Sequence, residues 1–441
     1  MTNQLQFNVS FPKFNFDQQF SFQSGLHVIY GESGCGKSAL INQIIGLKTG
    51  HENFLLTNIN CPEEIQKIFQ NPDTQIVSST VGGELAFSLE CRSKDQELIS
   101  SKLIQLKKTL FFECADHRHP ATLSGGEKEM LNIITVFSVD PQLVLIDDGL
   151  SFLNAERKEE VVDYIYNRIA ETDCIVFWLT SDCNDFQFGV SQWELSLSYL
   201  NEWFGKIKPL MPNERTSQAN NLIIECRDLC FNYNGSGNLF NSFNIKIDDF
   251  RTLGITGTNG CGKTTLAKLL LEIEKPESGF VSLTKLGETV AIAYLEQFPE
   301  KMMGADSLAE FVDRLVNAGK LDKHKISHAV NNLKNCQLDW GQIKNKTAFE
   351  LPWSTLRLVL TIWLLNCEYD LLILDEPTFG LGRQQVLTLV RYLELYLKNK
   401  HLIIISHDSE FIHTFCDRVF DMDQLLIKTK TDKNIYLEFN S

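Results

Sequence analysis

Two glycine-rich segments of this chain contain the residue types that bind phosphate. They read GESGCGKS (31–38) and GTNGCGKT (257–264), and each lies between an apolar run typical of a buried strand and a run typical of a helix. In this context the glycines let backbone N–H groups surround a phosphate, the lysine reaches its oxygens, and the final hydroxyl can hold Mg²⁺. The predicted nucleotide contacts are Gly31, Glu32, Ser33, Gly34, Cys35, Gly36, Lys37, Ser38, Gly257, Thr258, Asn259, Gly260, Cys261, Gly262, Lys263 and Thr264.

A further candidate for phosphate binding is LSGGE (123–127), which precedes a predicted helix, Lys128–Phe137. The hydroxyl of Ser124 and the amides of Gly125 and Gly126 would attract negative charge through free N–H groups and the helix dipole. Alone, a serine–glycine–glycine triplet is most often a turn. The two phosphate loops elsewhere in the chain favour the phosphate-binding interpretation.

The motifs occur twice at a constant spacing. The two phosphate-loop lysines are 226 residues apart, and two apolar runs that end in acidic residues, LVLIDD and LLILDE, are 228 apart. This regularity indicates a tandem duplication. We therefore predict two domains, residues 1–200 and 221–441. The intervening residues 201–220 contain two prolines and little periodicity, so they are the predicted linker.

Together these motifs resemble the nucleotide-binding domains of ABC ATPases, with their Walker A, Q-loop, signature, Walker B and switch positions. The resemblance implies an α/β fold in each domain: a P-loop parallel-sheet core, an antiparallel β subdomain and a small helical subdomain, here Lys94–Phe112 and Asp306–Leu338. It implies ATP and Mg²⁺ as cofactors, and a head-to-tail sandwich in which each signature faces the Walker A loop of the other domain. The metal-binding residues that it implies are Ser38, Gln70, Asp147, Thr264, Gln297 and Asp375.

An aromatic side chain stacks on adenine in that family. Tyr233 is the candidate in the second half, and Phe11 is a weaker one in the first. Packing in the core is the alternative for both. Alternation of apolar and polar residues over residues 1–30 predicts antiparallel strands there.

The catalytic positions differ between the two halves. After the Walker B aspartate the family has a glutamate that orients the attacking water, which is Glu376 in the second half but Asp148 in the first. The aspartate carboxylate retracts by about 1 Å, a displacement that can lower the rate on the order of a hundredfold. The switch position is His407 in the second half and Ser181 in the first, whose hydroxyl is too short to reach the γ-phosphate. With Glu376 and His407, Gln297 completes the predicted catalytic set.

The signatures differ in the opposite sense. The second half has LPWST (351–355) where the first has LSGGE, so a proline without an N–H and a bulky tryptophan replace residues that admit phosphate. In a head-to-tail sandwich, LPWST would face the first Walker A loop, in the composite site that also contains Asp148 and Ser181. All three departures from the family pattern therefore fall in one ATP site, and the other site keeps Glu376, His407 and LSGGE. We therefore predict one site that holds ATP and one that hydrolyses it.

The run FQNPDTQ (69–75), followed by a predicted helix at Thr80–Leu89, resembles the ATPase subunits of energy-coupling-factor importers and their cobalt-type relatives. In those proteins this segment lies beside the groove that receives a membrane subunit. An ordinary Q-loop is the alternative. The resemblance implies separate membrane partners, a transmembrane coupling protein and a substrate-binding protein, at the inner face of the cell membrane. The implied cargo is a vitamin, a vitamin precursor or a transition-metal ion.

Composition excludes several other classes. The net charge of −15 and pI near 5.1 argue against binding a polyanion such as nucleic acid. The twelve cysteines form no CxxC pair and fit a reduced, cytoplasmic protein. No signal peptide is visible, and no apolar run approaches the roughly 18 residues of a spanning helix, so a transport pore would be another polypeptide.

The alternative from another functional class is a tandem ABC ATPase that acts on the ribosome in translation. Such proteins share the two domains but carry a long charged linker and usually two intact signatures. The short predicted linker, the acidic composition and LPWST all favour transport instead.

Overall fold

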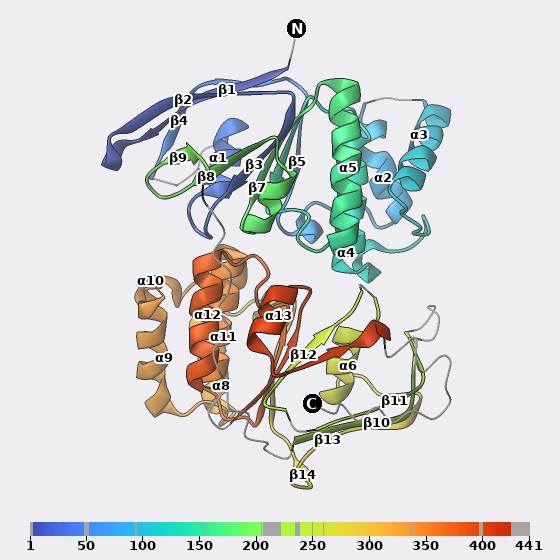
Figure 1. The fold of residues 1–441 in the computed structure, drawn as a ribbon, viewed down its shortest axis with the longest axis vertical. Helices are drawn as coiled ribbons and strands as arrows, with labels where there is room; N and C mark the ends of the chain where they lie inside the picture. The colour runs from blue at the N-terminus through green and yellow to red at the C-terminus, as the bar shows by residue number, and fades with distance from the viewer. Residues whose placement is uncertain are drawn as a thin grey trace. The chain divides into compact units, whose positions relative to one another are not determined.

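The computed structural model describes residues 3–47, 53–92, 95–153, 155–203, 205, 222–233, 239–248, 250–258, 260–336, 338–396 and 400–424. The chain divides into two compact units, Met1–Ile207 with Gly380–Arg383 and Lys208–Phe379 with Gln384–Ser441. Figure 1 colours the first unit mainly blue to green and the second mainly yellow to red.

A six-stranded sheet forms the centre of the first unit. Its strands in spatial order are β5 (Ile65–Ile68), β6 (Leu143–Asp147), β7 (Ile175–Thr180), β3 (Gly25–Tyr30), β8 (Ser191–Leu195) and β9 (Leu200–Glu202). All neighbours are parallel except β8 and β9. Alternate residues of β7 pack into two different cores, Trp178 on one face and Phe177 on the other. Burial on both faces explains why these strands read as continuous apolar runs.

Four helices of the first unit, between Val81 and Thr172, cover one face of this sheet, whereas the helix Lys37–Ile44 lies on the other face together with a small antiparallel sheet (Figure 1). The antiparallel sheet has the order β2 (Phe16–Gln23), β1 (Gln4–Phe11) and β4 (Leu55–Asn60), which confirms the antiparallel strands predicted near the N-terminus. The α-helices are α1 (Lys37–Ile44), α2 (Val81–Glu90), α3 (Gln96–Thr109), α4 (Gly125–Phe137) and α5 (Ala155–Thr172). Short 3₁₀ turns are η1 (Pro12–Phe14), η2 (Pro72–Thr74), η3 (Pro120–Thr122) and η4 (Cys183–Phe188).

The second unit repeats this plan. Its parallel sheet has the order β15 (Ile292–Leu295), β16 (Leu371–Asp375), β17 (His401–Ile405), β12 (Thr252–Thr256) and β18 (Arg418–Asp421). Its antiparallel sheet has the order β11 (Phe240–Ile247), β10 (Leu222–Phe231), β13 (Ser278–Lys285) and β14 (Glu288–Thr289). Its helices are α6 (Lys263–Leu270), α7 (Glu300–Met303), α8 (Leu308–Asn317), α9 (Lys323–Asn335), α10 (Trp340–Ile343), η5 (Ala348–Glu350), α11 (Trp353–Leu365), α12 (Arg383–Tyr396) and α13 (Ser409–Phe415). Parallel cores with antiparallel and helical additions confirm the predicted α/β fold.

Two boundaries differ from the sequence-based expectation. The helix predicted from Lys128 begins three residues earlier, at Gly125, because Ser124 caps it. The segment predicted to be helical, Asp306–Leu338, contains α8 and α9, which are joined by a turn at Gly319, where φ is +65°. The predicted linker begins too early: β9 extends to Glu202, and the Trp203 ring stacks on Phe186 with centroids 4.3 Å apart. Residues 206–220 of that linker lie outside the described residues.

In the described ranges, no helix combines the length and apolarity needed to cross a membrane.

Candidate nucleotide-binding sites

The first phosphate loop joins β3 to α1. Gly34 and Gly36 have φ of +85° and +108°, values that favour glycine, and Gly36 caps the helix. The Lys37 ammonium donates to the carbonyl of Gly31 at 2.7 Å and to the Ser181 hydroxyl at 2.9 Å. The loop therefore has the wrapped backbone and inward lysine that phosphate binding requires.

The second phosphate loop has the same conformation between β12 and α6. Gly260 and Gly262 have φ of +83° and +105°, and the Lys263 ammonium donates to the carbonyls of Gly257 at 2.7 Å and Thr258 at 3.0 Å. Asn259, also a predicted ATP contact, lies outside the described residues.

Each phosphate-loop hydroxyl meets a Walker B carboxylate at the carboxyl end of the parallel strands. Ser38 donates to Asp147 at 2.9 Å, and Thr264 donates to Asp375 at 2.8 Å. Hydroxyl and carboxylate oxygens are the donors that Mg²⁺ prefers, so the second pair fits this ion. Burial and the neighbouring Glu376 charge raise the pKa of Asp375 to about 7, which indicates a carboxylate whose charge a cation would stabilise.

The acidic residue after each Walker B strand has a strained backbone. Asp148 and Glu376 have φ of +50° and +51°, and each backbone N–H donates at 2.8 Å to a carbonyl at the end of the next strand, Leu179 or Ile405. Non-glycine residues adopt this left-handed region at a cost and are found there mainly at functional sites. The two halves therefore hold this residue in the same backbone conformation.

The surroundings of the two acidic side chains differ. Asp148 accepts from the Ser181 backbone N–H at 2.5 Å and from its hydroxyl at 2.8 Å, and lies 3.4 Å from the Lys37 ammonium. The amide of Gln70 also donates to it at 3.4 Å. Donors within the first unit thus surround the Asp148 carboxylate.

Glu376 has fewer strong donors. The Ser406 hydroxyl donates to it at 3.0 Å and the His407 backbone N–H at 3.4 Å, while the His407 Nε2 atom lies 3.6 Å from its other oxygen. Burial, helped by the charge of Lys263, lowers the pKa of His407 to about 4. The imidazole is therefore neutral near pH 7, and burial raises the pKa of Glu376.

The intact signature is a helix cap. The Ser124 hydroxyl accepts from the Glu127 backbone N–H at 3.3 Å, and the Glu127 carboxylate accepts from the Ser124 N–H at 2.8 Å. A Cβ atom added to Gly125 would lie 2.7 Å from the Phe152 ring, so this position has no space for a side chain.

The aligned LPWST segment is built into the core of the second unit. Pro352 caps α11 without a side-chain hydrogen bond. The Trp353 indole is buried, donates to Glu300 at 2.9 Å and packs against the rings of Phe298 and Phe379. An indole fills the place at which the first half keeps a glycine.

The two aromatic candidates for adenine stacking differ in exposure. Tyr233 is 39% exposed, and its hydroxyl lies 3.3 Å from that of Thr265 beside the second phosphate loop. Phe11 is fully buried and packs against the rings of Phe16 and Phe54. Core packing therefore accounts for Phe11, while Tyr233 stays a prediction.

Comparison with known proteins identifies the family. The model of the ABC transporter family matches residues 17–151 and 240–379. The chain belongs to the ABC transporter family. Its two matched segments are ABC ATPase domains, which bind ATP and imply ATP hydrolysis.

Related ABC proteins cover nearly the whole chain. A protein named "Putative ABC transporter ATP-binding protein" from Bacillus thuringiensis subsp. konkukian (strain 97-27) is 25% identical and covers 90% of this chain and 85% of its own length. A protein of the same name from Methanosarcina mazei is 25% identical, and the match covers 92% of this chain and 84% of that protein. Among solved structures, a chain of the "Model of ribosome-bound archaeal Pelota and ABCE1" matches with a TM-score of 0.65 and 17% identity, over 93% of this chain and 79% of that chain. The structural likeness shows the shared fold alone.

The structure adds a residue of the second ABC domain that the sequence analysis missed. The guanidinium of Arg357, on α11, is fully buried and donates to the backbone carbonyls of Gln297 at 2.7 Å, Asp375 at 3.3 Å and Glu376. It therefore ties the Q-loop and the end of Walker B to the signature helix. A lone arginine in the apolar run WSTLRLVLTIWLL was the signal that could have identified it.

Replacing Arg357 with methionine is expected to lower the free energy of unfolding of the second unit by about 3 kcal/mol, because buried carbonyls lose their donors. Scanning calorimetry of the full chain would measure the loss. The matched control is Arg314→Met, because the Arg314 side chain is 55% exposed and pairs with Asp306 at 2.9 Å. It should cost less than about 1 kcal/mol. Equal effects of the two substitutions would refute the positioning role.

The pKa of His407 predicts a pH dependence of stability. Because its folded pKa is lowered below the unfolded value, its contribution is present above about pH 6.5 and is lost as pH falls toward 4. With partial solvent screening, we expect wild type to lose about 1 kcal/mol more than His407→Gln between pH 7 and pH 5. Chemical unfolding of both proteins at each pH measures this difference. Identical pH profiles would contradict the expectation.

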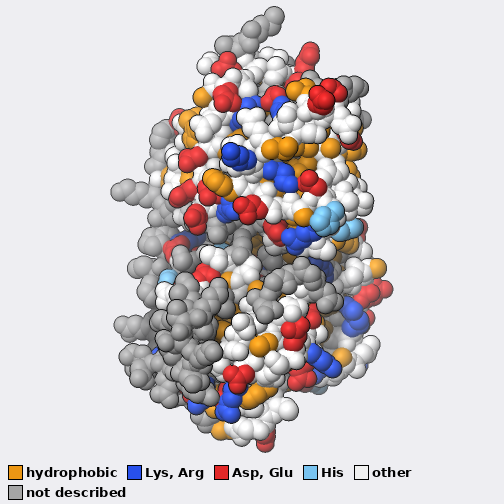
Figure 2. Space-filling view, turned by 90° about the vertical axis from the view of Figure 1, so that its right-hand side faces the viewer, with side chains coloured by type: hydrophobic (Ala, Val, Ile, Leu, Met, Phe, Trp, Pro, Cys, Tyr) orange, Lys and Arg blue, Asp and Glu red, His pale blue; other side chains and the backbone are white. Residues whose placement is uncertain are grey.

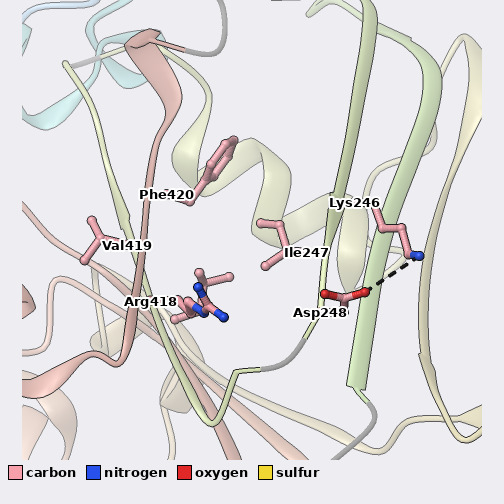
Figure 3. A pocket seen from close by; sticks show the side chains of 7 residues that line it. Lys246, Ile247, Asp248, Arg418, Val419 and Phe420 are labelled. Carbon is pink, nitrogen blue, oxygen red and sulfur yellow. Dashed lines mark ion pairs between the residues drawn. The ribbon is translucent and has the colours of Figure 1, made fainter. Parts of the chain in front are cut away.

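A small pocket lies elsewhere in the second ABC domain. Its lining includes Lys246 of β11, Asp248 just after that strand, Leu253 of β12, and Arg418 and Phe420 of β18, and its interior of about 10 Å³ has room for about one water molecule. Lys246 and Asp248 form an ion pair at 3.7 Å, drawn as a dashed line in Figure 3. None of the predicted site residues lines this pocket.

Proposed function

We propose that this chain is the ATP-hydrolysing subunit of an ABC importer of the energy-coupling-factor type, with one hydrolytic and one degenerate ATP site. The observation that carries the proposal is the contrast between the two acidic residues after Walker B. Asp148 is held by Ser181 and Lys37, whereas Glu376 lies beside a neutral His407. A carboxylate that several donors stabilise is a weaker base than one with fewer donors, and this difference supports Glu376 as the base.

In the proposed hydrolytic site, Glu376 orients the attacking water and accepts its proton, with Gln297 helping to place that water. Neutral His407 donates to the γ-phosphate, and Lys263 contacts the β- and γ-phosphates. Thr264, Asp375 and Gln297 would hold Mg²⁺, which would neutralise phosphate charge when bound. In a head-to-tail sandwich Ser124, Gly125 and Gly126 would complete this site, while LPWST would face the first phosphate loop, which holds ATP.

A membrane partner is proposed from the surface of the first ABC domain next to Gln70. Phe69, Val77 and Phe87 are 40%, 68% and 47% exposed around η2 and α2. The turn η2 is held in place, because Lys128 pairs with Asp73 at 2.6 Å. Figure 2, which looks onto the side of this unit that carries α3, shows exposed apolar side chains among charges of both signs. We call Phe69, Val77 and Phe87 the apolar ridge. Exposed apolar side chains beside a fixed turn fit an apolar helix of a membrane subunit.

The proposed assembly has one copy of this chain at the cytoplasmic face of the membrane, with a transmembrane coupling protein and a substrate-binding membrane protein. Closing and opening of the two domains with ATP would move the coupling protein between conformations. The proposed cargo is a vitamin, a vitamin precursor or a transition-metal ion.

Affinity purification tests this proposal. The tagged chain is extracted from its own cells in mild detergent at moderate salt, and its partners are identified by mass spectrometry. Small multi-spanning membrane proteins are the expected partners. Ribosomal proteins without any membrane partner would refute import and favour a role in translation.

A pair of surface variants makes the test sharper. Val77→Asp should lower recovery of the membrane partner about tenfold, since it places a charge in an apolar interface. Leu286→Asp, at a residue 74% exposed beside the β13–β14 turn, is the matched control and should not change it. Equal recovery with both variants would exclude the ridge as the docking surface.

A further inference from the structure

The two ABC domains place different side chains against the Walker B aspartate. Lys67 on β5 lies opposite Leu145 of β6, and its ammonium is 3.3 Å from Asp147. Tyr294 on β15 occupies the aligned position opposite Ile373, and its hydroxyl is 3.3 Å from Asp375. The same site in the fold thus carries a cation in the first domain and a neutral hydroxyl in the second.

Three contacts hold Lys67 in place. Its ammonium donates to Asn42 at 3.3 Å, lies 4.8 Å from the centre of the Phe69 ring and pairs with Asp147. The side chains of Lys67 and Asp147 are 14% and 7% exposed. A mostly buried ammonium with three partners, one of them a carboxylate, is a fixed part of the site rather than a solvated surface charge.

The charge balance of the first site is complete without a metal ion. Asp147 pairs with Lys67, and Asp148 lies 3.4 Å from Lys37. Two carboxylates therefore face two ammonium groups. An added divalent cation at Asp147 would meet the positive charge of Lys67 at close range or would have to displace it from its three contacts.

The second site has a different partner at its Walker B aspartate. Asp375 accepts from the hydroxyls of Thr264 and Tyr294, and Glu376 accepts from Ser406. Among the described residues, no lysine or arginine forms an ion pair with either carboxylate. Lys263 and Arg357 lie near these carboxylates but donate to backbone carbonyls, so a divalent cation at Asp375 would displace no ammonium group from that carboxylate.

We propose that the first domain binds its nucleotide without a divalent cation, because Lys67 supplies at Asp147 the positive charge that Mg²⁺ supplies at Asp375. The ligand is thus the metal-free anion of ATP or ADP. The inference rests on the proposed function in that the first phosphate loop holds a nucleotide. It departs from the expectation that Ser38, Gln70 and Asp147 bind Mg²⁺. The absence of Mg²⁺ also explains why the first site would hold its nucleotide without hydrolysing it, because an ammonium group polarises a phosphate less than Mg²⁺ does.

Photolabelling of the full chain tests this inference. The probe is 8-azido-ATP with Mg²⁺ or with excess EDTA, and mass spectrometry assigns each labelled peptide to residues 1–200 or 221–441. Labelling of the first half should change less than about threefold on removal of Mg²⁺, whereas labelling of the second half should fall about tenfold or more.

Variants at the aligned position complete the experiment. Lys67→Met should make first-half labelling fall in EDTA as the second half does, and Lys67→Arg, which keeps the charge, should leave it insensitive. Tyr294→Phe is the matched control and should not alter the first half. Labelling in the presence of Mg²⁺ shows that each variant is folded. If Lys67→Met is not labelled even with Mg²⁺, the effect of EDTA on wild type and on Lys67→Arg tests the inference instead.

Two results would overturn the inference. One is a wild-type first half that loses its label in EDTA as strongly as the second half. The other is a Lys67→Met protein whose first half is labelled with Mg²⁺ and stays insensitive to EDTA. A first half that is labelled in neither condition would instead refute the proposed nucleotide-holding site itself, and this inference with it.

Discussion

Glu376→Gln lowers the steady-state rate of ATP hydrolysis by about a thousandfold, the loss expected when a general base that is also the water-orienting group becomes a neutral amide. The amide occupies the same volume and can still accept from Ser406, so nucleotide binding and stability should change little. Phosphate release under saturating ATP and Mg²⁺ measures the rate, and nucleotide binding measured in parallel shows that the site remains intact.

Asp148→Asn is the matched control in the first domain. It is the same change from carboxylate to amide at the aligned position, with the same left-handed backbone. Because Asp148 is predicted not to act as a base, the rate should change by less than about threefold. A loss as large as that of Glu376→Gln would refute the division into one hydrolytic and one degenerate site.

Gly125→Val is expected to lower ATP turnover about a hundredfold or more, the effect of removing a transition-state contact, although Gly125 belongs to the domain with the degenerate base. The reason is that a side chain at the signature would separate its amides from the γ-phosphate in a head-to-tail sandwich. Steady-state phosphate release measures turnover, and labelling of each half of the chain by 8-azido-ATP measures binding.

A second variant separates this effect from local crowding. The added Cβ would lie 2.7 Å from the Phe152 ring, so displacement of Phe152 is another route to inactivity. Phe152→Ala removes that contact. If Gly125→Val with Phe152→Ala remains inactive while Phe152→Ala alone is active, the signature acts on phosphate. Recovery of activity in the double variant would show that crowding was the cause.

Much of this site could be predicted because its chemistry depends on short runs. The phosphate loops need glycine at positive φ, and both lie where the sequence placed them. The buried parallel strands could be predicted because continuous apolar runs end in acidic residues, as in LVLIDD and LLILDE. Alternation near the N-terminus predicted antiparallel strands, since one face of each is buried.

What could not be predicted depends on contacts between distant segments. Lys67 and Asp147 are 80 residues apart, and only the register of β5 on β6 brings them together. The carbonyls around Arg357 come from two separate loops. The linker was placed too early because Leu200–Glu202 is a short polar strand whose pairing with β8 carries no periodic signal.

The burial of Trp353 has a consequence for the evolutionary history of the chain. Returning LPWST to a glycine signature would remove an indole that packs against Phe298 and Phe379, at a cost of about 3–5 kcal/mol for the cavity left behind. That loss is a large share of the stability of a domain and would come before any catalytic gain. Reversion to a glycine signature by single substitutions therefore passes through a destabilised protein. The packing of Trp353 thus disfavours reversion and preserves the difference between the two halves.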